Sequence, residues 1–158
     1  ENTVALVKSL LKKNMISVHL HPEAQNSTFI ASPQQMGQVL MNLINNSVEA
    51  ITGMPGYFEH VHLSQGGECS ISIRTFNRDD HFVIEVKDSG PGIPPGDLNR
   101  IFDPFFTSKK PMGMGVGLAI CHGIIEEHQG KITAENAPGG GAAFTITLPL
   151  RQAVRDGQ

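Results

Sequence analysis

The sequence has little cysteine and no long hydrophobic run, and both absences exclude whole classes of protein. Its 158 residues include two cysteines, Cys69 and Cys121, which lie in apolar segments without the spacing of metal ligands. We therefore expect buried free thiols of a reducing compartment rather than a disulfide framework. No apolar stretch approaches the length of a membrane-spanning helix, about 20 residues, and no basic-then-apolar leader opens the chain.

A strong excess of either charge is also lacking. The formal net charge is −3, and no basic block interrupts the sequence. Because a protein that binds nucleic acid through phosphates carries a basic surface, we expect no nucleic-acid partner. With 39% hydrophobic and 17% charged residues, the chain has the composition of one globular domain. We expect a cytoplasmic domain, whether the full-length protein is free or tethered to a membrane.

The apolar pattern predicts helices and strands without an internal repeat. Helical spacing marks residues 3–13, 32–51 and 115–128, and the last helix is expected to stop at a left-handed Gly130. Alternation predicts a strand at 16–21 with a short partner at 29–30, and two hairpins, 69–74 with 82–88 and 131–136 with 143–148. We expect residues 1–150 to form a single domain, with a surface loop at 53–67 and a frayed tail at 151–158.

The helix that begins after Ser32 has a strong start signal and an unusual polar stripe. Ser32 is placed to cap it, Pro33 to occupy its first turn, and Gln35 to complete a capping box. Spacings of four and three bring four polar side chains to the side opposite the apolar face: Gln38, Asn42, Asn46 and Glu49. Asparagine is a poor helix former, so this stripe fits either a solvated face or a functional one.

Residues 88–119 combine a carboxylate with two groups of glycines. The inward parity of residues 82–86 places Asp88 on the core-facing side where its strand ends. Its carboxylate therefore needs a hydrogen-bond donor, from the protein or from a ligand. The glycines are Gly90 and Gly92, then Gly113, Gly115 and Gly117 at the start of a helix. Their spacing is not that of a Walker A loop or a dinucleotide-binding fingerprint, and the motifs of eukaryotic protein kinases are absent.

These residues together predict a site for Mg-ATP. A carboxylate can accept a hydrogen bond from the exocyclic amine of adenine, whereas guanine presents a carbonyl oxygen there. The first glycine pair lets the backbone approach the purine closely. The later glycines expose N–H groups at a helix start, where anions bind, and Lys109 and Lys110 add positive charge. The amide oxygens of Asn42 and Asn46 are ligands that Mg²⁺ accepts.

Four motifs in this order resemble the catalytic and ATP-binding domain of sensor histidine kinases, in the GHKL ATPase superfamily. QVLMNLINNSVEAI resembles the N-box, DSGPGI the G1 box, IFDPFFTSK the F-box and GMGVGLAI the G2 box. The resemblance implies the Bergerat fold, an α+β two-layer sandwich in which helices cover one face of a mixed, mostly antiparallel sheet. It implies ATP between the N-box helix and a lid at about residues 108–114. The nucleotide-binding residues that it implies are Asn42, Asn46, Glu49, Asp88, Gly90, Gly92, Ile93, Phe102, Thr107, Lys109, Gly113, Met114, Gly115, Val116, Gly117 and Leu118, with Asn46 and Asn42 on Mg²⁺.

The resemblance also implies a protein histidine kinase. The γ-phosphoryl group would pass to a histidine on a separate dimerisation domain, and a response regulator receiver domain would be a further partner. None of the seven histidines here has the sequence context of that acceptor, so we expect the dimerisation domain to be absent from this chain. We expect the isolated domain to be monomeric and the full-length protein to be a homodimer. No general base is assigned in this domain.

Two positions narrow the resemblance. DNA gyrase and the heat-shock chaperones carry glutamate where Asn42 stands, and asparagine cannot accept a proton, so Asn42 suits phosphoryl transfer rather than hydrolysis. Glu49 matches the subgroup of nitrogen-regulation and oxygen-sensing kinases. Two alternatives stay open: a serine kinase of the anti-sigma-factor type on the same fold, and a non-catalytic ATP-binding regulatory module.

Overall fold

A mixed sheet forms one layer of the protein. The computed structural model describes residues 2–57, 67–107 and 115–150, and within them five strands pair in the order β1-β2-β3-β5-β4. β1 (Ser17–Pro22) is parallel to β2 (Ser70–Arg78). β3 (His81–Asp88), β5 (Ala142–Pro149) and β4 (Lys131–Asn136) follow in antiparallel pairs. The predicted mixed, mostly antiparallel sheet and both hairpins are confirmed.

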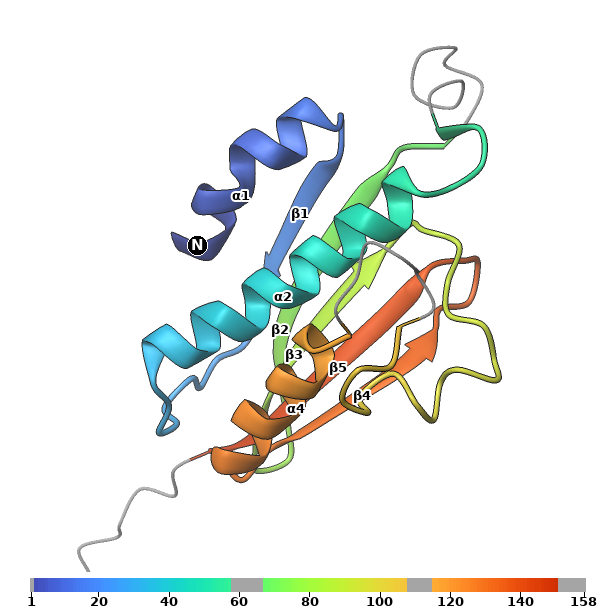
Figure 1. Ribbon diagram of the computed structural model, residues 1–158. Helices are drawn as coiled ribbons and strands as arrows, with labels where there is room; N and C mark the ends of the chain where they lie inside the picture. Colours follow the sequence, from blue (N-terminus) through green and yellow to red (C-terminus); the bar gives the residue numbers. More distant parts are fainter. Residues whose placement is uncertain (1, 58–66, 108–114, 151–158) are drawn as a thin grey trace, which may run out of the picture.

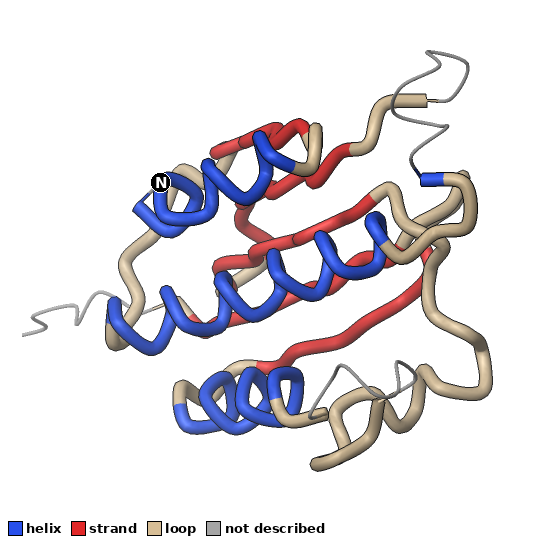
Figure 2. The backbone as a smooth tube through the Cα atoms, turned by 45° about the horizontal axis from the view of Figure 1, so that its top comes forward, coloured by secondary structure: helices blue, strands red, loops and turns tan. Residues whose placement is uncertain are grey.

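The helices form the other layer. α1 (Asn2–Lys13), α2 (Pro33–Thr52) and α4 (Gly117–Glu127) lie on one face of the sheet (Figure 1, Figure 2). Alternate strand residues point to that face, where Ile71, Val86 and Ile146 are fully buried against the helices. This removal of apolar surface from water is the main force that holds the two layers together. No helix in the described part of the chain is long and apolar enough to cross a membrane.

α2 makes the crossover between the parallel strands β1 and β2, which cannot be joined by a tight turn. As predicted, the Ser32 hydroxyl caps the helix by accepting the Gln35 N–H at 3.3 Å. The second half of the predicted capping box is wrong. The side-chain amide of Gln35 donates to Glu127 at 3.2 Å, and the Ser32 N–H donates to Nε2 of His128 at 3.1 Å. The start of α2 is thereby tied to the end of α4.

The predicted partner strand at residues 29–30 is wrong. The chain after β1 forms no strand and is held by side chains instead. Oδ1 of Asn77 accepts the N–H groups of Gln25 and Asn26, both at 2.9 Å. Phe29 stacks on Phe82 with ring centroids 4.8 Å apart. The edge strand β1 pairs with β2 instead. Residues 23–32 therefore only connect β1 to α2.

Both predicted ends of the last helix need correction. α4 begins at Gly117 rather than at residue 115, because Gly115 has φ +68°, which lies outside the helical region. At the other end the left-handed residue is Gln129, with φ 58°, and not Gly130. Glycine is required at 130 for another reason: a Cβ there would lie 2.6 Å from the carbonyl oxygen of Thr147.

The predicted fate of the cysteines is confirmed, since Cys69 and Cys121 are both buried and free. Of the predicted loop at 53–67, residues 58–66 lie outside the described part, as does the predicted tail at 151–158. The first part of the loop packs on the core, because Tyr57 is buried and donates its hydroxyl hydrogen to the carbonyl oxygen of Asn14.

Candidate functional site

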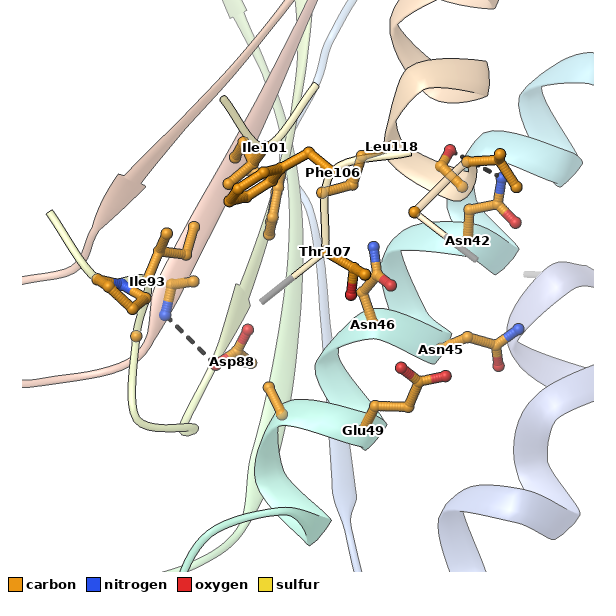
Figure 3. Close-up of a pocket in the computed structure, with 18 residues that line it drawn as sticks. Asn42, Asn45, Asn46, Glu49, Asp88, Ile93, Ile101, Phe106, Thr107 and Leu118 are labelled. Atoms are coloured by element: carbon orange, nitrogen blue, oxygen red, sulfur yellow. Dashed lines mark hydrogen bonds between the residues drawn. The ribbon is translucent and has the colours of Figure 1, made fainter. Parts of the chain in front are cut away.

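A pocket of about 370 Å³ lies where α2, β3, β5 and the start of α4 meet. This volume is in the range of sites for small organic ligands, about 300–1,000 Å³. Figure 3 shows the α2 side chains Asn42 and Asn46 on one side of it, with Asp88 and Ile93 on the other. Its 18 lining residues are Asn42, Asn45, Asn46, Glu49, Ala50, Asp88, Gly92, Ile93, Pro94, Ile101, Phe106, Thr107, Gly115, Val116, Gly117, Leu118, Ala142 and Phe144.

Asp88 lies at the end of β3, is only 4% exposed and still lines the pocket. Oδ1 accepts the backbone N–H of Gly90 at 2.8 Å and of Ala142 at 3.3 Å. Oδ2 accepts the hydroxyl of Ser47 at 3.4 Å. The strand parity predicted a buried carboxylate that needs a donor from the protein or from a ligand, and the protein supplies donors to both oxygens. These bonds also hold the Asp88 carboxylate as a hydrogen-bond acceptor in the wall of the pocket.

The backbone around Asp88 is packed so closely that a side chain at either of two glycines would force neighbouring atoms to move. A Cβ at Gly141, where φ is +83°, would lie 1.8 Å from the carbonyl oxygen of Asp88. A Cβ at Gly90 would lie 2.8 Å from Oδ1 of Asp88. Gly90 was predicted to contact a ligand, but it does not line the pocket; it donates its N–H to the carboxylate.

The turn at residues 92–94 is held by a side chain that sequence reasoning missed. Oδ1 of Asn136 accepts the Ile93 N–H, and Nδ2 of Asn136 donates to the Ile93 carbonyl, both at 2.7 Å. Gly92 has φ +81°, and a Cβ there would lie 2.7 Å from the same Oδ1. This bidentate contact from β4 holds the segment at Ile93, one of its three residues that line the pocket.

The polar stripe of α2 divides into two parts. Asn42, Asn46 and Glu49, which were predicted to bind the nucleotide, line the pocket together with Asn45, whereas Gln38 is exposed and lies outside it. Nδ2 of Asn42 donates to the Gly117 carbonyl at 3.3 Å, which links the stripe to the first turn of α4 (Figure 3). Asn45 was missed although it lies three residues after Asn42 and four before Glu49, so the same spacing rule could have placed it on this side of the helix.

The start of α4 faces the same pocket through Gly115, Val116, Gly117 and Leu118. The N-cap residue of the helix makes no side-chain capping bond. The first N–H groups of a helix without such a cap favour an anion, both by hydrogen bonding and through the helix dipole. The predicted phosphate cradle is thus in contact with the asparagine stripe.

The aromatic segment that precedes this helix is folded back onto it. The Phe105 N–H donates to the Gly115 carbonyl at 2.9 Å, and a Cβ at Gly115 would lie 2.6 Å from the carbonyl oxygen of Phe106. Phe106 lines the pocket, although the sequence identified it only as part of the F-box motif. Phe102, a predicted ligand contact, does not line it; it packs edge-on against Phe144 with ring centroids 6.5 Å apart.

Three predicted site residues, Lys109, Gly113 and Met114, lie outside the described part of the chain, together with the predicted lid at 108–114. Besides Asn45 and Phe106, sequence reasoning missed five lining residues: Ala50, Pro94, Ile101, Ala142 and Phe144. Most of them are apolar and follow the same periodicity as core residues, so no pattern distinguishes them.

The chemistry of the lining fits a purine nucleotide with a divalent cation. Ile93, Ile101 and Phe106 offer apolar walls for a ring, and Asp88 offers an acceptor at its edge. Within the described residues no group of three His, Cys, Asp or Glu side chains is placed to hold a metal alone. A cation here would need the oxygens of Asn42 and Asn46 together with oxygens of the ligand, as is usual for Mg²⁺.

Next to the stripe, α4 is buried against α2 at Cys121. The Cys121 thiol donates to the Val39 carbonyl at 3.7 Å and is fully buried. Burial raises the pKa of the Cys121 thiol to about 11, and a hydrogen bond with the Asn42 side chain opposes this shift. The thiol therefore stays protonated and unreactive at neutral pH, and it holds α2 and α4 together.

Comparison with known proteins gives consistent matches. The family described as histidine kinase-, DNA gyrase B-, and HSP90-like ATPase matches residues 31–152. The sensor histidine kinase TmoS of Ectopseudomonas mendocina is 34% identical over 94% of this chain, which spans 14% of that relative. The catalytic domain of histidine kinase ThkA superimposes with a TM-score of 0.76, at 30% identity, covering 94% of this chain and 88% of that structure. ThkA in complex with the response regulator protein TrrA matches with a TM-score of 0.71, at 29% identity over 94% of this chain and 38% of that one.

Proposed function

Because the chain belongs to the histidine kinase-, DNA gyrase B-, and HSP90-like ATPase family and has the fold of a histidine kinase catalytic domain, we propose that it binds Mg-ATP for phosphoryl transfer. In the full-length protein the γ-phosphoryl group would go to a histidine on a separate dimerisation domain. The single observation that carries this proposal is the buried Asp88 carboxylate, which faces the asparagine stripe of α2 across one pocket.

In this proposal, each wall of the pocket binds one part of the nucleotide. Asp88 accepts the exocyclic amine of adenine, and the turn at 92–94 lies against the ring. The N–H groups at the start of α4 bind phosphate oxygens, and Asn42 and Asn46 bind Mg²⁺. The bound cation would neutralise charge on the phosphates. The predicted contacts of Lys109, Gly113 and Met114, and the lid, belong to the same proposal.

Asn42 decides between transfer and hydrolysis in this proposal. A general base for water must take up a proton, and an amide cannot do so near neutral pH. The side chain also donates to the Gly117 carbonyl, so it holds the start of α4. Positioning and charge neutralisation account for most of the catalysis in phosphoryl transfer. The site is therefore suited to hold ATP until an acceptor arrives.

The wider setting is also a proposal, since the chain spans only 14% of the relative TmoS. A response regulator receiver domain would be the partner downstream, by analogy with the ThkA–TrrA complex. Glu49, which lines the pocket one turn after Asn46, would place the chain with the nitrogen-regulation and oxygen-sensing kinases. Residues 1–150 would form a single catalytic unit with a short tail.

Asp88→Asn tests the adenine contact with little change in shape. The amide keeps one oxygen for the N–H groups of Gly90 and Ala142, but turns an N–H₂ group towards the adenine amine. We expect ATP affinity to fall about 10- to 100-fold, the equivalent of a charge-assisted hydrogen bond, in a calorimetric titration. Asp80→Asn, the same change at an exposed carboxylate beyond the other end of β3, should leave the affinity unchanged. Equal affinity in all three proteins would refute the proposed role of Asp88.

Transfer itself needs the acceptor. The chain is mixed with the dimerisation helices of its full-length protein and labelled Mg-ATP, and the product is tested for stability in acid. We expect an acid-labile phosphohistidine on the helices. An acid-stable phosphoserine on a partner would favour the serine-kinase alternative, and ATP binding without any transfer would favour a regulatory module.

A further inference from the structure

Ser47 is a buried polar residue that the stripe of α2 does not explain. It lies on the apolar face of the helix and is 1% exposed. Among the described residues, Ser47 and Asp88 are the buried polar or charged side chains. Burying a hydroxyl is costly unless it is hydrogen-bonded, and alanine would fill this place with a better helix propensity. The hydroxyl therefore needs a role that repays its burial.

The partner of Ser47 is the carboxylate at the pocket floor. Its Oγ donates to Oδ2 of Asp88 at 3.4 Å, across 41 residues of sequence. Oδ1 of the same carboxylate accepts the two backbone N–H groups of Gly90 and Ala142. The main chain thus holds one oxygen, and a side chain from α2 reaches the other. At 3.4 Å the second contact is long for an O–H···O bond, and a carboxylate oxygen has room for two donors.

We propose that Ser47 is a positioning residue for base recognition: its hydroxyl fixes the plane of the Asp88 carboxylate so that Oδ2 accepts the exocyclic amine of adenine. This inference rests on the proposed nucleotide function. The terminal torsion of an aspartate has a broad range. A bond at Oδ2 narrows the range of orientations that the bonds to Oδ1 allow. Ser47 then strengthens the contact with the amine without touching the nucleotide.

Ser47→Ala separates this role from simple packing when two nucleotides are compared. One is ATP, and the other is purine riboside triphosphate, which has hydrogen in place of the amine. We expect Ser47→Ala to weaken ATP binding about fivefold, because Ser47 acts on the amine only through Asp88, and to change binding of the second nucleotide by less than about twofold. Ser47→Thr retains the hydroxyl and should retain the wild-type preference for ATP, even if its extra methyl group lowers the melting temperature.

Each other result overturns the inference. Unchanged ATP affinity in Ser47→Ala means that the hydroxyl does not act on Asp88 in the complex. An equal loss for both nucleotides means that Ser47 only supports the shape of the pocket. In both of these cases, the proposed function still stands if the wild-type chain binds ATP and prefers it to the amine-free nucleotide. A wild-type chain that binds neither nucleotide overturns the proposed function and the role of Ser47 together.

Discussion

The turn between β4 and β5 offers a matched pair of glycines that measures how tightly Asp88 is enclosed. Gly139 and Gly141 have almost the same positive φ, +86° and +83°. A Cβ at Gly139 would have no heavy atom within 4 Å, whereas a Cβ at Gly141 would lie 1.8 Å from the carbonyl oxygen of Asp88. Both alanine variants therefore strain the backbone, but only Gly141→Ala also clashes with the end of β3.

The expected difference follows from these two contributions. A left-handed backbone costs a non-glycine residue about 1–2 kcal/mol, and this cost applies to both variants. For Gly141→Ala the separation must also grow from 1.8 Å to at least 3.0 Å, and such overpacking typically costs about 1–3 kcal/mol. We therefore expect a loss of about 1–2 kcal/mol in unfolding free energy for Gly139→Ala and about 2–5 kcal/mol for Gly141→Ala. For a chain of this size the gap corresponds to roughly 2–12 °C in Tm.

Thermal unfolding followed by circular dichroism measures the gap, and titration with ATP at a temperature where both variants are folded measures the effect on the site. Gly141→Ala should bind ATP more weakly because Asp88 must move, whereas Gly139→Ala should bind as the wild type does. Melting temperatures of the two variants that agree within about 1 °C would refute the packing argument.

Two further predictions concern the segment at residues 92–94 and the buried Cys121 of α4. Asn136→Ala removes both bonds to Ile93, so both ATP affinity and the free energy of unfolding should fall, the latter by about 1–3 kcal/mol. The control Asn77→Ala removes similar side-chain bonds to the backbone far from the pocket and should lower stability alone. An equal loss of ATP affinity in both variants would contradict this prediction. Because burial raises the pKa of the Cys121 thiol from 9.0 to about 11, the folded state keeps a proton that the unfolded chain loses, so stability should decline as pH rises through that window. Urea unfolding should show a shallower decline in Cys121→Ala, and parallel declines would count against it.

The sequence predicted the layers of this protein because periodicity reports which side of an element is buried. The parity of β3 placed Asp88 on the core side, and the helical spacing placed Asn42, Asn46 and Glu49 on one face. Both predictions needed only local geometry. The start of α2 was correct for the same reason, since Ser32 and Pro33 act within one turn.

The features that sequence reasoning missed depend on contacts between distant segments. Gln35 would bond its own N-cap in an isolated helix, but Glu127 and His128 compete for the same groups once α4 packs beside it. Asn136 holds Ile93 from 43 residues away. No spacing rule links such pairs. The apolar lining residues were missed because the wall of a ligand site and the wall of a core have the same composition.

The crossover position of α2 has a consequence for how the protein reaches its binding-competent state. Ser47 meets Asp88 across 41 residues, Asn42 meets Gly117 across 75, and Ser32 meets His128 across 96. Contacts this remote in sequence require long loops to close, which is slow and comes after local structure. The hairpins β2–β3 and β4–β5 need no such closure. Nucleotide affinity should therefore be among the last properties gained during folding, and a partly folded chain with only its two hairpins in place would still have no pocket.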